Sequence, residues 1–503
     1  MRSCASPARA PGSVARPASH GTLWTALLLV VLAFAFQGSR GLYELDESRY
    51  TGIALQMLDS GQWWVPEYNA GEPHLAKPPL TYWSIAASMG VLGRNAWAAR
   101  LPSALAFVFT GLLVIALAQA LGSMQPWRAG VLWAGMLVPF VGSNIVLPDP
   151  LLALFETLAV LGFVRSGLLT GAVSSRNALQ LMWLGLGLAF FAKGTPALLP
   201  LLAAATWLAW QRRWRALAAL FIPEGLLAFV VLGLGWYLSI VAVHTDWLSY
   251  FLGHELVDRM FSGAHHRNSD WVDIFRVYGP TLLLGSLPWL PLLLVRREPA
   301  GGGAAGSDRL QGSWLAWWFT VPLIVFALSR SRLPHYLLPL FVPLALLLER
   351  RCGWLTPLTQ RRLLWFAGVW MLGLIALKGG AARFEHDADV RRLSLEIAPV
   401  AARLSHPLVD IAFVDHRAVH GLRLYTGQPV REAMLPGIDP RPDRLYTPLL
   451  VCAPGNAPAG RLWLVPERLA GRFVQVTAGC GLAARALGPP LRDWLPYEVL
   501  PGA

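Results

Sequence analysis

An acidic cluster follows the first apolar run of the chain. Glu44, Asp46 and Glu47 supply three carboxylates within four residues, and Arg49 follows them closely. Charged groups at a membrane boundary cost free energy unless they are solvated or paired, so such a cluster indicates a functional site. A carboxylate held there could act as a general base on a hydroxyl group. The alternative is a solvated loop in which Asp46 caps the helix that follows it.

Cations and aromatic rings recur together in three later segments. These are Ala76-Lys77-Pro78-Pro79-Leu80-Thr81-Tyr82-Trp83, the loop around His265-His266-Arg267, and Ser329-Arg330-Ser331-Arg332-Leu333-Pro334-His335-Tyr336. Ammonium and guanidinium groups bind phosphate through charge-assisted hydrogen bonds. For Lys77 the alternative is a side chain that snorkels to the membrane interface. The two adjacent histidines are a weak metal signal, because their side chains project in different directions.

Two single residues add to these segments. Asp149 places a carboxylate at a helix start, where it either serves a site or caps the helix. Lys193 ends an apolar run, so it either contacts a phosphate or snorkels, and its position favours snorkelling.

The composition is that of a membrane protein. Of 503 residues, 55% are hydrophobic and 14% charged, and the mean hydropathy is +0.47, whereas an average soluble domain is about 25% charged. The net charge of +13 would indicate nucleic-acid binding in a soluble protein. Here most arginine clusters lie in short gaps between apolar runs, as at 212–215 and 350–362, where they act as positive-inside signals. We therefore exclude a nucleic-acid partner.

We expect a polytopic α-helical membrane protein with about eleven spans (11–13). A spanning helix needs roughly 20 apolar residues. Such runs lie near 21–38, 101–121, 129–147, 150–164, 178–192, 195–210, 217–243, 277–295, 313–328, 334–348 and 361–378. With residues 1–20 in the cytoplasm, the arginine clusters fall inside. The acidic cluster and the three cationic segments then fall on or near the periplasmic face.

The chain divides into a transmembrane domain, 21–378, with a large first outer loop, 39–100, and a soluble extracytoplasmic domain, 379–503. Within the loop, 47–60 and 80–92 are predicted to be helices lying along the membrane surface. Short apolar runs between Pro and Gly turns predict a C-terminal α/β domain, with strands near 411–414, 449–451 and 462–465. Cys452 and Cys480 share that domain, and the sequence leaves open whether they pair.

Taken in order, the motifs resemble one family. They are DESRY, IALQML, GQWWVPEYNAGEPHLAKPPLTYW, RNAWAARLPSAL, LPDP, AHHR and SRLPHYLLPL. Over about residues 40–345 they resemble, in order and spacing, the lipid A aminoarabinose transferases and the related protein O-mannosyltransferases of glycosyltransferase family 39 type. The resemblance implies the glycosyltransferase C fold. It does not extend to the segment beyond residue 380.

The resemblance also implies roles for individual residues. Asp46 matches the first-loop aspartate that the family treats as catalytic, and Glu47 accompanies it. The expected contacts of the donor phosphate are Lys77, Arg267 and Tyr336, to which we add Arg49 and Arg332. The expected donor and acceptor pocket contains Asp149, His266, His335 and Tyr82.

One position departs from the family pattern. The family motif commonly reads Glu-Lys-Pro, whereas Ala76 precedes Lys77 here. In the aminoarabinose transferases that glutamate lies near the donor sugar and is linked to metal binding. The resemblance requires no cofactor. Ala76 leaves open whether a divalent metal is used and which sugar is transferred.

We expect a glycosyltransferase of the bacterial inner membrane that takes a sugar from polyprenyl (undecaprenyl) phosphate and gives it to an envelope acceptor such as lipid A or another glycan. A nucleotide site is not needed, and the sequence contains no Gly-rich phosphate loop. The alternative within this class is a protein O-glycosyltransferase. A secondary transporter would show matching halves with broken helices, and a non-catalytic scaffold would leave the converging charges unexplained.

Overall fold

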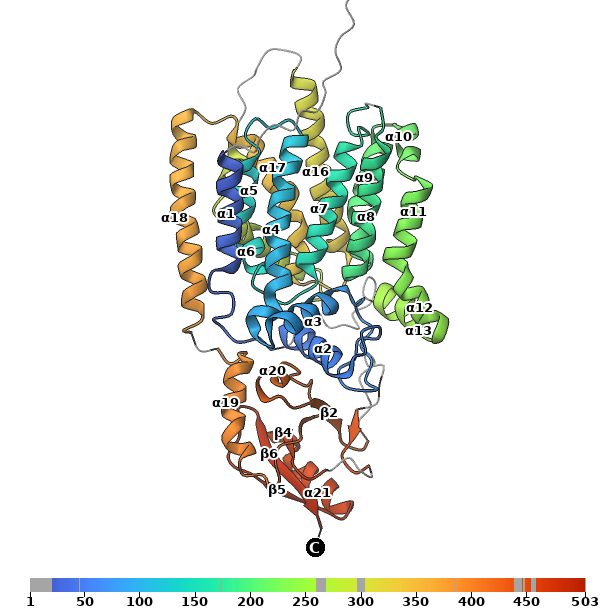
Figure 1. The fold of residues 1–503 in the computed structure, drawn as a ribbon, viewed down its shortest axis with the longest axis vertical. Helices are drawn as coiled ribbons and strands as arrows, with labels where there is room; N and C mark the ends of the chain where they lie inside the picture. The colour runs from blue at the N-terminus through green and yellow to red at the C-terminus, as the bar shows by residue number, and fades with distance from the viewer. Residues whose placement is uncertain are drawn as a thin grey trace, which may run out of the picture.

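The structure is a computed structural model that describes residues 20–44, 46–171, 173–258, 268–295, 304–384, 386–437, 446, 448–453 and 458–502. The molecule is elongated (Figure 1). A helix bundle occupies one end, a mixed sheet with its helices occupies the other, and two helices of the first outer loop lie between them.

The bundle is built from apolar helices that pack lengthwise (Figure 1). Its helices are α1 (His20–Phe34), α4 (Ala96–Ala120), α5 (Trp127–Gly135), α6 (Leu137–Gly142), α7 (Asp149–Arg165), α8 (Arg176–Lys193), α9 (Leu199–Trp210), α10 (Trp214–Ala219), α11 (Pro223–Phe229), α12 (Gly235–Val243), α13 (Trp247–Ser249), α15 (Gly279–Gly285), α16 (Ala304–Leu328), α17 (Phe341–Cys352) and α18 (Pro357–Ala381). Short 3-10 or π-helical turns join them: η1 (Thr195–Leu198), η2 (Val230–Leu234), η3 (Tyr250–Asp258), η4 (Ile274–Tyr278), η5 (Leu290–Leu294) and η6 (Pro334–Leu340).

Four helical stretches of the described residues are long and apolar enough to cross a membrane. They are Ala96–Ala120, Pro223–Val243, Arg309–Leu328 and Pro357–Ala381. The expected total of about eleven spans stays a prediction. Two expected spans are interrupted: 129–147 divides at the extended residue Met136, ahead of Pro139, and 277–295 divides into η4, α15 and η5. Proline explains both breaks, because it lacks the N–H that continues a helix.

The first outer loop forms the two helices that the sequence predicts. They are α2 (Asp46–Ser60) and α3 (Leu80–Leu92). Instead of lying only against a membrane surface, α2 is enclosed between the bundle and the C-terminal domain (Figure 1). Ile53, Ala54 and Met57 are fully buried in a hydrophobic cluster that includes residues of both neighbours. The start of α2 is therefore fixed from two sides.

The C-terminal domain is a six-stranded sheet with the order β3-β2-β1-β4-β6-β5. The strands are β1 (Asp410–Val414), β2 (Val430–Met434), β3 (Leu449–Leu450), β4 (Arg461–Pro466), β5 (Leu482–Ala486) and β6 (Trp494–Pro501). Strands β3, β2, β1 and β4 are parallel to one another, and Ile411 of β1 lies opposite Val430 of β2 and Leu462 of β4. The pairs β4–β6 and β6–β5 are antiparallel. Helices α19 (Val390–Ala401), α20 (Leu422–Thr426) and α21 (Ala470–Gly479), with the turn η7 (Glu467–Leu469), cover it. Cys452 and Cys480 form a disulfide with a Cα–Cα distance of 5.8 Å.

This domain is docked closely on the first outer loop. The hydroxyl of Ser48 accepts a 2.6 Å hydrogen bond from the Gly421 amide, and His420 lies directly against Gly52. Ion pairs at the edges join Arg423 to Asp59, Arg431 to Glu72 and Arg492 to Glu44, at 2.8, 3.1 and 2.9 Å. Small residues at positions 48, 52 and 421 permit this approach of the two backbones.

The substitution Gly52→Ala tests the docking contact. An added Cβ would lie 2.5 Å from the His420 Cβ and 3.0 Å from its carbonyl oxygen. We expect the free energy of unfolding to fall by about 1–3 kcal/mol, seen as a lower melting temperature in detergent. In the control Gly471→Ala the new Cβ meets no atom within 4 Å, so that melting temperature should be unchanged or slightly higher. Equal melting temperatures for the two variants would contradict the contact.

Candidate active site

A polar cavity opens where the first outer loop meets the bundle. Five parts of the chain line it: the start of α2, the segment before α3, the start of α7, the end of α8 and η6. Its walls are Asp46, Arg49, Tyr50, His74, Ala76, Lys77, Leu147, Pro148, Asp149, Lys193, Leu333, His335 and Tyr336. Residues separated by almost 300 positions in the sequence thus share one small space.

Asp46 and Arg49 form one wall on the first turn of α2. The guanidinium donates to the Asp46 carboxylate at 2.5 Å, a pair one helical turn apart. Arg49 also lies 5.2 Å from the centre of the Tyr50 ring, which stacks on Tyr82 at 5.3 Å. The ring pair orients the guanidinium, and the Arg49 Nε has no hydrogen-bond partner among the described residues.

Lys77 forms a second wall. Pro78 and Pro79 follow it and restrict the backbone. Its ammonium donates to the Glu255 carboxylate of η3 at 3.1 Å and to the carbonyl of Ala76. The lysine is therefore held facing the cavity and does not extend outward to an interface.

The third wall is a buried ion pair between α7 and α8. Lys193 pairs with Asp149, and both side chains are almost completely buried. The Lys193 ammonium lies 4.4 Å from the centre of the Tyr336 ring, and the His335 Nε2 lies 4.0 Å from the Asp149 carboxylate. The predicted snorkelling of Lys193 is wrong, because its ammonium is paired inside the protein.

A signal for Lys193 was present in the sequence. The chain has 42 basic residues, of which only Lys77, Lys193 and Lys378 are lysines. Arginine supplies the remaining positive charge, including the clusters between spans. Two of the three lysines line this one cavity. The scarcity of lysine in the sequence could therefore have identified Lys193 as a candidate site residue.

His74 adds an uncharged ring to the cavity wall. Burial, and then the nearby Arg49 guanidinium, hold its pKa well below the usual value of 6.5. Burial also raises the pKa of the Tyr82 hydroxyl well above 10.0. At neutral pH the His74 imidazole is therefore neutral and adds no positive charge to the cavity.

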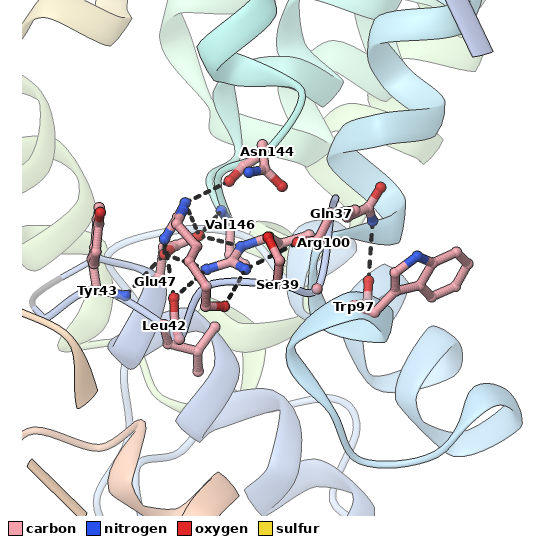
Figure 2. A network of polar contacts seen from close by, with 12 residues as sticks. Gln37, Ser39, Leu42, Tyr43, Glu47, Trp97, Arg100, Asn144 and Val146 are labelled. Atoms are coloured by element: carbon pink, nitrogen blue, oxygen red, sulfur yellow. Dashed lines mark hydrogen bonds and ion pairs between the residues drawn. The ribbon is translucent and has the colours of Figure 1, made fainter. Parts of the chain in front are cut away.

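Glu47, the neighbour of Asp46, turns away from the cavity into a hydrogen-bond network (Figure 2). Its carboxylate accepts from Arg40 at 2.7 Å and from Arg100 at 2.9 Å, and from the amides of Tyr43 and Val146 at 2.9 and 3.1 Å. Burial opposes ionisation, but Arg100 and Arg40 outweigh it and lower the pKa of Glu47 to about 2. Glu47 thus ties α2 to α4 and to the segment before α7.

The residues predicted for the site divide into three groups. Those on the cavity wall are Asp46, Arg49, Lys77, Asp149, His335 and Tyr336. Tyr82, Glu47 and Arg332 lie outside the wall; Arg332 is fully buried and donates to the carbonyls of Asn268, Asp270 and Ala327 at 2.9, 2.9 and 3.0 Å. His266 and Arg267 lie outside the described residues. Sequence order alone could not separate a cavity arginine from one that binds backbone carbonyls.

An apolar cavity of about 440 Å³ adjoins the polar one. Ala76, Lys77, Lys193 and Tyr336 line both cavities. Beyond them the walls are mainly apolar and come from α8, η1, α12, η3 and α16, with members such as Phe190, Leu199, Leu238, Phe251, Leu252 and Phe326. The two lysines therefore stand where a charged space meets an apolar one.

The described residues do not supply a metal site here. They contain no group of three or more His, Cys, Asp and Glu residues arranged to hold a metal ion. Ala76, at the position of the family's glutamate, brings no side-chain ligand atom to the polar cavity.

Comparisons with known proteins agree with the family resemblance that the motifs indicate. The family model described as dolichyl-phosphate-mannose-protein mannosyltransferase matches residues 23–249. An undecaprenyl phosphate-alpha-4-amino-4-deoxy-L-arabinose arabinosyl transferase of Edwardsiella ictaluri is 34% identical over 335 residues, 65% of this chain and 58% of that protein. One from Pseudomonas fluorescens is 33% identical over 370 residues, 70% of this chain and 64% of that protein. The chain spans about three fifths of the length of these relatives.

The fold agrees over almost the whole chain. The crystal structure of ArnT from Cupriavidus metallidurans bound to undecaprenyl phosphate superposes with a TM-score of 0.73 at 19% identity, covering 96% of this chain and 98% of that one. The predicted resemblance is confirmed. The chain is a multi-pass membrane protein with the glycosyltransferase C fold of these transferases.

The substitution Glu47→Gln tests whether Glu47 stabilises the packing of α2 against α4 and the segment before α7. Breaking a buried ionic network by removing one partner costs about 3–5 kcal/mol, so the melting temperature should fall clearly. The folded pKa of about 2 lies below the ordinary value of 4.5, so this stabilisation exists above pH 4.5 and is lost as the pH falls toward 2.

The control for this test is Glu224→Gln, which removes the carboxylate of the exposed ion pair with Arg176. That variant should melt close to the native protein, because exposed ion pairs contribute little. If Glu47→Gln also melted like the native protein, Glu47 would not be the tie between α2, α4 and the segment before α7.

Proposed function

We propose that this protein is a glycosyltransferase that moves a sugar from a polyprenyl-phosphate carrier to a cell-envelope acceptor, such as lipid A or another glycan, on the periplasmic face of the inner membrane. The observation that carries this proposal is the junction of the two cavities. Lys77 and Lys193 stand between a polar space and an apolar space of about 440 Å³. A polyprenyl phosphate has a charged phosphate at one end and a long apolar chain, so its two parts match the polar and the apolar cavity.

The donor phosphate is assigned to the cationic side of the junction. Lys77 and Lys193 supply ammonium groups, Arg49 supplies a guanidinium, and Tyr336 borders both cavities. Arg267 joins this set as a sequence-based candidate outside the described residues. The relatives named above use undecaprenyl phosphate sugars according to their names, which supports the same carrier for this chain. In a site with little water, fixed cations stabilise a phosphate leaving group strongly.

The reaction follows as a direct displacement at the anomeric carbon. The acceptor oxygen bonds to that carbon while the bond to the carrier phosphate breaks, and polyprenyl phosphate leaves with the electron pair. Asp46, which lines the polar cavity and not the apolar one, takes the proton of an acceptor hydroxyl. If the acceptor is itself a phosphate, no proton moves, and Asp46 positions the sugar.

The periplasmic orientation rests on three features of the fold. The polar cavity, the first outer loop and the C-terminal domain all lie at one end of the bundle (Figure 1). The C-terminal domain contains the Cys452–Cys480 disulfide, which suits an oxidising compartment. The arginine clusters at the opposite end fit the positive-inside rule.

Protein O-glycosylation is the second candidate. It is favoured by the match of residues 23–249 to a protein mannosyltransferase model. The donor chemistry would be the same, because both reactions release a polyprenyl phosphate, and only the acceptor differs. Offering lipid A and peptide acceptors in parallel separates the two.

Asp46→Asn tests the general base. With undecaprenyl-phosphate sugars and an envelope acceptor, the purified native protein should release undecaprenyl phosphate, and the variant should be slower by about 10²- to 10⁴-fold. Its melting temperature should not change, because the Asp46 side chain is 37% exposed and lies outside the Glu47 network. Full turnover by the variant would remove Asp46 from the catalytic role.

Lys77→Ala tests the phosphate contact. Hydrogen bonds to charged groups contribute about 1.5–3 kcal/mol, so the KM for the donor should rise by roughly 10- to 100-fold while acceptor affinity stays constant. Arg94→Gln is the control, since it removes an exposed cation of the same loop that pairs with Asp59. A donor KM that changes equally in both variants would reject the assignment of Lys77.

A further inference from the structure

A second groove lies at the opposite end of the bundle from the candidate active site. It has a volume of about 520 Å³ and is bordered by the end of α4, the starts of α5 and α18, α16 and the end of α17. These helix ends point away from the C-terminal domain (Figure 1). The groove is lined by Ala118, Leu121, Gly122, Ser123, Met124, Gln125, Arg128, Gln311, Leu315, Leu346, Glu349, Arg350, Gly353 and Gln360.

The charged side chains of this groove have a net positive charge. Arg128 donates to the Gln360 side chain at 2.6 Å, and Arg350 donates to the Gln311 side chain at 3.0 Å. The one carboxylate of the lining, Glu349, accepts from the Ser123 hydroxyl at 2.5 Å. Two guanidinium groups and one carboxyl group therefore line the groove, a balance that suits an anionic headgroup.

A small apolar slot of about 20 Å³ adjoins the groove. Arg128 and Gln360 line both spaces. Beyond them the slot is formed by Val131, Leu132, Trp289, Cys352, Leu363, Leu364 and Ala367. Trp289 is 1% exposed, and its indole N–H has no acceptor among the described residues. The slot has room for little more than a water molecule, so an acyl chain must lie outside it.

The adjoining surface is suited to hydrocarbon. Leu364, Trp365 and Val369 of α18 are exposed apolar residues, and α18 is one of the helices able to cross a membrane. A molecule seated in the groove, which Gln360 of α18 borders, would therefore adjoin the lipid around α18.

We propose that this groove binds the phosphate headgroup of an anionic glycerophospholipid, with its acyl chains along the exposed apolar face of α18. Basic recesses between transmembrane helices at the cytoplasmic face suit such headgroups. The choice of leaflet rests on the orientation given under Proposed function; the binding chemistry does not. A free phosphate would satisfy the arginines but would leave the exposed apolar face of α18 unused.

Native mass spectrometry of the purified full-length protein tests this proposal. The delipidated protein is offered equal amounts of phosphatidylglycerol and phosphatidylcholine. We expect the phosphatidylglycerol complex to dominate, because each arginine near a headgroup favours the anionic lipid by roughly fivefold. This comparison needs no variant, and equal retention of the two lipids would overturn the proposal.

The double variant Arg128→Gln/Arg350→Gln should lose the preference. Its matched control is Arg361→Gln/Arg362→Gln, which removes two exposed arginines of α18 at the same end of the bundle that do not line the groove. The control should keep the preference. An equal loss in both double variants would mean that the lipid is attracted to the basic surface in general. That result would overturn the proposal of a specific binding site in the groove.

A thermal series separates a lipid from free phosphate. Phosphatidylglycerol should raise the melting temperature of the native protein but not of the groove variant. Inorganic phosphate should raise neither. A rise with inorganic phosphate equal to that with the lipid would contradict the lipid assignment. None of these readouts uses glycosyl transfer, so they stand apart from a failure of the proposed function.

Discussion

The buried carboxylate of Glu47 is the interaction on which the geometry of the polar cavity depends. It joins three parts of the chain: the first turn of α2, Arg100 in α4, and the amide of Val146, three residues before Asp149 (Figure 2). Arg100 also donates to the carbonyls of Gln37, Arg40 and Gly41. A buried ion pair is tolerated when its remaining donors are satisfied in this way. Asp46 and Asp149 are consequently held in the wall of one cavity.

The second constraint is the placement of lysines at a boundary between polar and apolar surfaces. Lys193 is buried and paired with Asp149, and Lys77 is held by Glu255. Each ammonium is thus partly neutralised in the free protein, which lowers the cost of keeping two cations in a space of low dielectric. An incoming phosphate competes with carboxylates for these cations. A lipid that brings both a phosphate and an apolar chain gains from both cavities at once.

Some of this arrangement follows from the sequence by elementary rules. Helical spacing predicted α2 and α3 within one residue of their ends, and alternating turns and apolar runs predicted β1, β3 and β4 within one residue at each end. The motif order predicted that Asp46, Lys77, Asp149 and Tyr336 share a site, and the cavity contains all four.

Other features depend on contacts that the sequence does not encode locally. Glu47 stands beside Asp46 in an acidic run, yet α2 turns the two carboxylates into different surroundings. Arg332 and Lys193 both lie near outer helix ends, but one binds backbone carbonyls and the other enters the cavity. Composition also could not tell a continuous span from one divided at Met136. These distinctions are made by tertiary packing.

The most direct test of the central claim is an experimental structure of the protein with undecaprenyl phosphate. The account predicts the phosphate at the junction of the two cavities, within hydrogen-bond reach of Lys77 and Lys193, with the isoprenoid chain in the apolar cavity. A lipid phosphate bound elsewhere on the molecule, with that junction free of lipid, would contradict it.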